Sequence, residues 1–155
     1  MKEHHYTCTL IEVNVDEISE SERQLITKAE EALKSAYAPY SEFKVGAAIL
    51  LQSGKIVLGS NQENAAYPSG LCAERVALFS AASQFKDERI IAMAVTTSKE
   101  TDEPIAPCGA CRQVMIEYEV KQNDAIKLLL SNASKKIYIS QSVENILPMI
   151  FKLEK

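Results

Sequence analysis

Apolar residues recur at helical spacing early in the chain and then give way to continuous apolar runs. Ser19-Glu20-Ser21-Glu22 has the pattern of a capping box, and apolar residues follow it at Leu25, Ile26, Ala29, Leu33 and Ala36. We expect a helix from Ser19 to about Tyr37, because the residue before Pro39 disfavours helical geometry. The run Val45–Leu51 predicts a buried strand. Ser53-Gly54 then predicts a tight turn into a second strand at Ile56–Gly59.

Strand and helix patterns alternate through the rest of the chain. Helices are expected at Cys72–Phe85 and Gly109–Tyr118, strands at Ile90–Thr97, Ile126–Leu130 and Lys136–Ile139, and a short helix or turn at Val143–Phe151. Residues 1–18 have mixed strand and loop character. This alternation indicates the α/β class, with helices on both faces of one mixed sheet of five strands.

Composition places the chain among ordinary globular proteins. Its 155 residues suit one domain, and its hydrophobic and charged fractions are 46% and 25%. No apolar run approaches the roughly 20 residues of a membrane span, and Met1-Lys2-Glu3-His4-His5 lacks the hydrophobic core of a secretion signal. We therefore expect a cytoplasmic protein that does not bind membranes. The net charge of −4 argues against a nucleic acid polymer as partner and favours a small substrate.

Two short stretches carry the candidate chemistry: Leu71-Cys72-Ala73-Glu74-Arg75 and Pro107-Cys108-Gly109-Ala110-Cys111-Arg112-Gln113. Cys72, Cys108 and Cys111 offer three thiols, and a catalytic zinc site uses three protein ligands with water in the fourth position. Glu74 stands two residues after the first thiol, where it could act as a general acid and base. Both stretches begin predicted helices, whose N-termini favour thiolates. Arg75 would offset the negative charge of three thiolates.

Other interpretations of these residues remain open at this point. A structural zinc site would need a fourth protein ligand, and only Cys8, His4 or His5 could supply it. None of these has motif spacing, and Cys8 is expected to be a half-buried thiol. Cys108 and Cys111 also form a C-x-x-C redox pattern, which leaves Cys72 and Glu74 unexplained. Glu74 could simply complement the dipole of its helix.

Four motifs in order resemble the small cytidine deaminases: Ala36-Tyr37-Ala38-Pro39-Tyr40-Ser41-Glu42-Phe43-Lys44-Val45-Gly46, Asn61-Gln62-Glu63-Asn64-Ala65-Ala66-Tyr67-Pro68, Cys72-Ala73-Glu74-Arg75 and Pro107-Cys108-Gly109-Ala110-Cys111. Such zinc deaminases are known to use three cysteine ligands with a separate glutamate as general acid and base. The resemblance implies a three-layer α/β/α sandwich with a five-stranded mixed sheet, one Zn²⁺ per subunit and a homotetramer. It also implies conversion of cytidine and deoxycytidine to uridine and deoxyuridine with release of ammonia.

The resemblance also assigns roles to individual residues. Asn61 and Glu63 match residues that bind ribose hydroxyls, Phe43 matches a ring beside the pyrimidine, and Ala73 belongs to the same substrate site. Ala65, Ala66 and Tyr67 would reach a neighbouring subunit's pocket. The sequence departs from the family in two places: residues 1–18 have no clear counterpart, and the usual Gly-Pro after Phe151 is missing.

Two other functions compete with this one. A deaminase of another cytosine-bearing compound, such as a nucleoside antibiotic, would share the thiols and Glu74. Asn61 and Glu63 argue against this alternative, because they favour a substrate with an ordinary ribose over one with an altered sugar. A zinc-stabilised binding protein without catalysis would have no need of Glu74.

Overall fold

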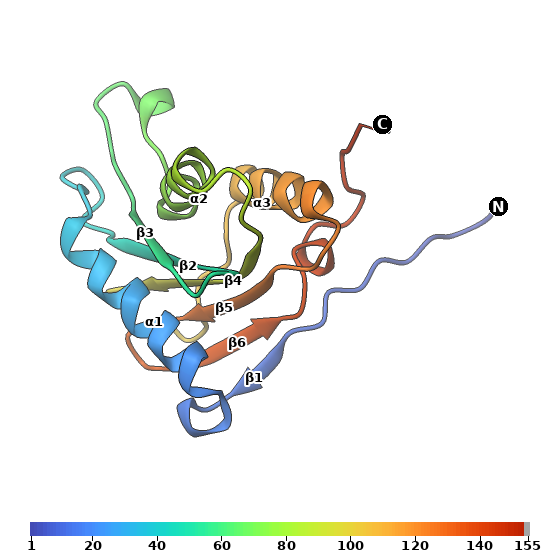
Figure 1. Ribbon diagram of the computed structural model, residues 1–155, viewed down its shortest axis with the longest axis horizontal. Coiled ribbons are helices and arrows are strands. Elements are labelled where there is room, and N and C mark those ends of the chain that lie inside the picture. Colours follow the sequence, from blue (N-terminus) through green and yellow to red (C-terminus); the bar gives the residue numbers. More distant parts are fainter. Residues whose placement is uncertain (154–155) are drawn as a thin grey trace.

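The computed structural model describes residues 1–153 as a six-stranded sheet covered by helices on both faces (Figure 1). The elements follow in the order β1 (Ile11–Val13), α1 (Glu20–Ala32), β2 (Val45–Leu51), β3 (Ile56–Ser60), α2 (Ala73–Gln84), β4 (Ile90–Thr97), α3 (Gly109–Gln122), β5 (Lys127–Ser131) and β6 (Ile137–Ser140). Short 3-10 turns lie at Val15–Glu17, Leu33–Ser35, Tyr67–Ser69 and Glu144–Ile146.

The strands lie in the order β1-β6-β5-β4-β2-β3, and among these neighbours only β4 and β5 are parallel. The sequence predicted five strands, and this number is wrong because β1 adds a sixth at the edge. β1 is only three residues long and pairs antiparallel with β6, so that Ile11 lies opposite Ile139. Its exposed side chains leave no buried face from which an alternating pattern could be recognised.

Two hydrophobic cores lie on the two faces of the sheet. α1 covers the face on which the strand residues Ala92, Ala94 and Leu129 lie. α2 and α3 cover the other face, on which Met93 and Leu128 lie (Figure 1). Successive residues of β4 thus enter opposite cores, as the period of two in a strand requires. The structure therefore has the three layers expected from the sequence.

Glycines allow helices to lie directly on the sheet at two points. A Cβ atom at Gly46 would lie 2.0 Å from the Ala29 carbonyl oxygen of α1, and one at Gly59 would lie 2.5 Å from the Ala73 carbonyl oxygen of α2. Both distances are far inside van der Waals contact, so only glycine fits. The contact at Gly59 fixes the first turn of α2, which follows Cys72, against β3.

The start of α1 confirms the predicted capping box. The Ser19 hydroxyl accepts the Glu22 amide at 3.3 Å, and Glu22 Oε2 accepts the Ser19 amide at 2.8 Å. Lys127 on β5 also donates to Glu22, at 2.9 Å. Burial opposes ionisation of this carboxyl group, but the hydrogen bonds from Lys127 and Ser19 outweigh it and lower the pKa of Glu22 to about 2. The helix ends at Ala32, earlier than expected, and continues as a 3-10 turn.

The two ends of the chain differ from the expectations. Residues 1–8 form an extended arm that leaves the body of the molecule, so Cys8 is exposed and not half-buried (Figure 1). The Asn145 side chain binds the Thr9 amide and carbonyl at 3.0 and 2.8 Å, where the arm joins the body. Within Val143–Phe151 only Glu144–Ile146 forms a helical turn. The following segment lies against α3, where the Gln113 side chain donates to the Phe151 carbonyl at 3.0 Å.

Glu119 is a buried carboxylate on α3 that binds three backbone amides. Oε2 accepts from Ile126 at 2.8 Å and from Val143 at 2.7 Å, and Oε1 accepts from Glu144 at 3.0 Å. These bonds join α3 to the start of β5 and to the C-terminal turn. They also stabilise the last turn of α3, which continues to Gln122, past the expected end at Tyr118.

We expect Glu119→Gln to destabilise the protein. The glutamine amide group would direct a donor at a backbone N–H, and hydrogen bonds to charged groups contribute about 1.5–3 kcal/mol. Tm of the zinc-loaded protein should fall by roughly 5–10 °C. Glu117→Gln, on the exposed side of the same helix, is the control and should leave Tm within about 1–2 °C. Equal shifts in both variants would contradict the prediction.

Candidate metal centre and substrate cleft

Three thiols from two helix N-termini meet at one point. Cys72 is the N-cap of α2, Cys108 is the N-cap of α3, and Cys111 lies in the first turn of α3. The Cys72 and Cys108 sulfurs are 3.8 Å apart, those of Cys108 and Cys111 are 3.5 Å apart, and all three lie within 4.8 Å of one another. The structure thus brings together residues that are 36 positions apart in the chain.

The surroundings of the cluster favour a thiolate. A hydrogen bond from Cys111 lowers the pKa of Cys72 to about 5, against the effect of burial and with help from Arg75 and Cys108. The same hydrogen bond, with burial, raises the pKa of Cys111. The thiols must be deprotonated to bind a metal ion, so a bound cation would favour the thiolate form of all three cysteines.

This donor set fits zinc. Soft thiolate sulfur is a preferred ligand of Zn²⁺, and three protein ligands leave one position for water. Within residues 1–153 the cluster contains these three thiols only, while Cys8, His4 and His5 belong to the N-terminal arm. A fourth protein ligand, which a structural zinc site would require, is therefore not among the described residues at this point.

Glu74 lies in the first turn of α2 and is buried, with only 4% of its surface exposed. A carboxylate that only complements a helix dipole would be expected in solvent, where ionisation costs little. Burial, and next the charge of Cys72, raises the pKa of Glu74. A raised pKa brings the carboxyl group nearer to neutrality, where it can both accept and donate a proton.

Arg75 supplies positive charge to the thiols. Its Nη2 atom lies 3.8 Å from the Cys72 sulfur. Its Nε atom is buried, and no group among residues 1–153 accepts a hydrogen bond from it. Cys72 accordingly raises the pKa of Arg75. The guanidinium group therefore offsets part of the negative charge that three thiolates would carry.

A cleft of about 950 Å³ opens beside the cluster of three thiols. Of the residues singled out in the sequence, the ones that line it are Phe43, Asn61, Glu63, Tyr67, Cys72, Glu74, Arg75 and Cys108. Cys111 is buried beneath the cleft, and Ala73 is enclosed against β3. Ala65 and Ala66 are exposed on the projecting loop between β3 and α2 and do not line this chain's own cleft (Figure 1).

The two residues matched to ribose binding hold the neighbouring loop. Asn61 accepts the Val45 amide and donates to the Phe43 carbonyl, each at 2.8 Å. The Glu63 carboxylate accepts the backbone amides of Tyr40 and Ser41 at 2.9 and 3.3 Å. Asn61 and Glu63 therefore fix the turn that carries Phe43 into the cleft.

Several residues of the cleft had no recognisable signal in the sequence. Tyr40, Ser41, Ile105 and Ala106 also line it, and the Tyr40 ring packs edge-on against Tyr67 with a centroid distance of 6.4 Å. All four lie in irregular segments, where no periodicity marks an inward-facing side chain. Their place inside motifs of the resembling family was the one available indication for Tyr40 and Ser41.

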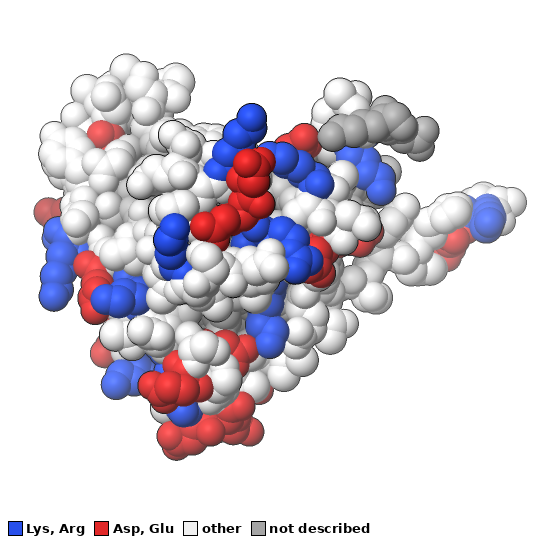
Figure 2. All heavy atoms as spheres, in the orientation of Figure 1, with Lys and Arg blue, Asp and Glu red and all other residues white. Residues whose placement is uncertain are grey.

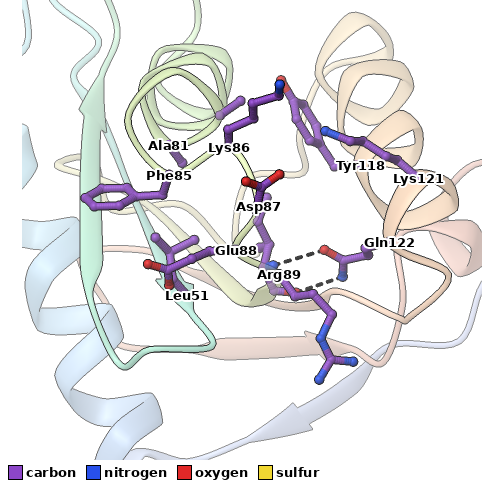
Figure 3. Close-up of a pocket in the computed structure, with 12 residues that line it drawn as sticks. Leu51, Ala81, Phe85, Lys86, Asp87, Glu88, Arg89, Tyr118, Lys121 and Gln122 are labelled. Atoms are coloured by element: carbon purple, nitrogen blue, oxygen red, sulfur yellow. Dashed lines mark hydrogen bonds between the residues drawn. The ribbon is translucent and has the colours of Figure 1, made fainter.

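A second pocket, of about 240 Å³, lies between the C-terminal ends of α2 and α3 (Figure 3). Phe85, Tyr118, Lys86 and Lys121 are among its lining residues, and Gln122 bonds both the Ile90 amide and the Ile90 carbonyl at 3.0 and 2.9 Å. Its lining contains no thiol, so it lacks the donor set found at the other end of these helices.

In the part of the chain that the structure describes, neither the charge distribution on the face in Figure 2 nor the composition of the helices points to a polynucleotide or a membrane span. On the face shown in Figure 2, Lys and Arg alternate with Asp and Glu, and no broad basic area is visible. Among residues 1–153, no helix combines the length and apolar content that crossing a bilayer requires.

A three-layer α/β fold with three thiols at two helix N-termini beside a buried carboxylate defines the class of zinc-dependent hydrolases that act on an amine-bearing base. Comparison with known proteins narrows this class. Residues 19–124 match the family described as the cytidine and deoxycytidylate deaminase zinc-binding region. The chain therefore belongs to the cytidine and deoxycytidylate deaminase family.

Individual relatives agree with this assignment. A cytidine deaminase of Halalkalibacterium halodurans is 48% identical over 95 residues, which cover 61% of this chain and 70% of the relative. One of Sporosarcina psychrophila is 39% identical over 135 residues, covering 84% and 91%. The crystal structure of cytidine deaminase from Burkholderia pseudomallei superposes with a TM-score of 0.75 and is 42% identical in sequence. The superposition covers 86% of this chain and 100% of the Burkholderia chain.

Proposed function

We propose that this protein catalyses the hydrolytic deamination of cytidine and deoxycytidine to uridine and deoxyuridine, with release of ammonia, and serves pyrimidine salvage. The observation that carries the proposal is the buried carboxylate of Glu74 beside the cluster of Cys72, Cys108 and Cys111, open to a cleft large enough for a nucleoside. Clustered thiols that must stay reduced to bind metal also fit a cytoplasmic location.

In the proposed mechanism the three cysteines hold one zinc ion. When bound, zinc acts as a Lewis acid that makes a water molecule nucleophilic at neutral pH. Glu74 would accept one proton from the attacking water and deliver it to ring N3. It would then accept the remaining proton of the hydroxyl group added at C4 and pass it to the amine, which leaves as ammonia while the C4 carbonyl forms. The reaction consumes one water and releases one ammonia for each nucleoside. Arg75 keeps the charge of the site from becoming too negative.

Phe43, Asn61 and Glu63, which line the cleft, are proposed to bind the nucleoside. The Ala73 side chain is fully buried, so Ala73 is proposed to contribute through its backbone alone. Phe43 offers an aromatic ring to the pyrimidine, and the Asn61 and Glu63 side chains offer polar atoms to the ribose. Glu63 is suited to accept a sugar hydroxyl because hydrogen bonds from the Ser41 side chain and then the Tyr40 amide lower its pKa, so it stays ionised.

Incubation of the purified zinc-loaded protein with cytidine, followed by ultraviolet absorbance, tests this function directly. We expect loss of the cytidine band together with formation of uridine and ammonia in equal amounts. Deoxycytidine, free cytosine and a cytosine nucleoside with an altered sugar serve as parallel substrates. Turnover of the altered nucleoside alone would favour the competing deaminase, and no turnover of any of them would overturn the proposal.

We further propose a homotetramer in which neighbouring subunits complete each site. Tyr67 and Phe151 are 79% and 70% exposed, and Phe79 on the outer side of α2 is 45% exposed. Because aromatic side chains are enriched at protein interfaces, these exposed rings favour contact with other subunits. Residues 64–71 contain no charge, and the corresponding projection is almost free of charged atoms in Figure 2. Ala65 and Ala66 on this projection would reach the neighbouring cleft. Tyr67 lines the cleft of its own chain, and its largely exposed ring would also contact the neighbouring subunit.

Dilution should therefore lower specific activity in parallel with dissociation of the tetramer. Phe151→Ala should raise KM for cytidine by roughly tenfold, since removing a buried aromatic contact costs on the order of 1–3 kcal/mol. Its zinc content should stay at that of the native protein. Leu153→Ala, a nearby exposed apolar residue, is the control. Light scattering that finds a fully active monomer at every concentration would contradict the prediction.

A further inference from the structure

The turn Tyr40–Phe43 at the rim of the cleft has a constrained backbone. Glu42 lies in the left-handed region with φ of 55°, and its amide donates to the Ala38 carbonyl at 3.1 Å. For a residue with a side chain this conformation costs about 1–2 kcal/mol. Such a conformation persists only where surrounding contacts hold it.

The Ser41 hydroxyl supplies two of the contacts at this turn. It donates to Glu63 Oε1, and it accepts the Phe43 amide at 3.0 Å. One oxygen atom thus joins the Glu63 carboxylate to the backbone that carries the Phe43 ring, and both residues line the cleft. A hydroxyl group can donate and accept at the same time, which alanine at this position cannot do.

The hydrogen bonds around Glu63 leave a defined part of its carboxylate free. An ionised carboxylate has about four acceptor positions. The Tyr40 and Ser41 amides occupy two on Oε2, and the Ser41 hydroxyl occupies one on Oε1. Among residues 1–153, one acceptor position on Oε1 therefore remains, and its direction is set by the Ser41 hydroxyl.

We propose that Ser41 is a positioning residue that fixes Glu63 and Phe43 relative to each other, so that the single free acceptor position of Glu63 meets one hydroxyl of the sugar while the Phe43 ring meets the base. The inference rests on the proposed function, because it assigns Ser41 to the affinity for a nucleoside. Ser41 acts on binding and takes no part in the proton transfers of Glu74.

Steady-state kinetics of the zinc-loaded protein on cytidine test this role. Ser41→Ala should raise KM about 10–100-fold, since a hydrogen bond to a charged group contributes about 1.5–3 kcal/mol. Its kcat should stay within about threefold of the native value. Ser41→Thr keeps the hydroxyl at an exposed position with room for a methyl group, and it should restore KM to within about threefold. Ser83→Ala, an exposed serine in the last turn of α2, is the control and should match the native protein.

A double-mutant cycle separates positioning from a general effect on the fold. If Ser41 acts through Glu63, Ser41→Ala should raise KM far less in a Glu63→Gln background than in the native one. An equal effect in both backgrounds, an unchanged KM in Ser41→Ala, or a failure of Ser41→Thr to restore KM would overturn the inference. Absence of cytidine turnover by the native protein would overturn the proposed function itself, so the two failures are distinguished.

Discussion

Glu74→Gln is expected to abolish nearly all turnover while zinc binding and fold are kept. The amide is almost the same size as the carboxyl group but cannot take a proton from water and pass it on. Each assisted proton transfer typically contributes about 10²–10⁴-fold, and Glu74 is proposed to assist several, so kcat should fall by several orders of magnitude. KM for cytidine should change much less.

This result is measured by turnover of cytidine together with zinc analysis and Tm of the same sample. Glu117→Gln makes the same chemical change on the exposed side of α3 and should leave kcat unaltered. If Glu74→Gln retained near-normal turnover with one zinc per chain, Glu74 would be removed from the mechanism. A variant that lost its zinc would instead show that the buried carboxyl group supports the metal centre.

Cys108→Ala is expected to remove most of the zinc and with it the activity. The two sulfurs left, Cys72 and Cys111, could not hold a zinc ion as three thiolates would. Elemental analysis of the purified variant after dialysis should give well below one zinc per chain. Cys8→Ala is the matched control, because this thiol lies exposed in the N-terminal arm. Undiminished zinc in Cys108→Ala, or loss of zinc in Cys8→Ala, would contradict the assignment.

Sequence patterns correctly predicted the strands whose side chains are buried on one or both faces of the sheet. The run Val45–Leu51 became β2 with the same bounds, and Ile90–Thr97 became β4. Both are central strands with apolar side chains on two faces, so their composition alone marks them. The short exposed strand β1 has no such composition, and its pairing with β6 depends on a long-range contact.

Helix ends were harder to predict for a different reason. α3 was expected to end near Tyr118, but it continues to Gln122, and Glu119 in the added turn is buried and accepts hydrogen bonds from three backbone amides. One of those amides belongs to Ile126, just before β5, and the other two belong to the C-terminal turn, 24 and 25 residues away in sequence. A buried charge satisfied by tertiary contacts cannot be told from a surface charge by periodicity.

For the candidate site, the spacing of cysteines identified the three thiols that the structure brings together, and adjacency pointed to Glu74. The contribution of Ser41 was missed, because a serine in a turn is ordinary and its hydrogen bond to Glu63 spans 22 residues. The hydrogen bonds of Asn61 to Phe43 and Val45 were likewise not foreseen. Side chains that act by holding other side chains leave little trace in a single sequence.

The origin of the thiols on two different helices gives the metal a mechanical role as well as a chemical one. Cys72 begins α2 and Cys108 begins α3, so a metal ion held by both closes a loop of 36 residues. By the chain-entropy argument that applies to disulfides, a cross-link of this length disfavours the unfolded chain by roughly 4 kcal/mol. The lifetime of the protein against proteolysis should therefore follow zinc supply, and a zinc-starved cell would lose the enzyme itself as well as its activity.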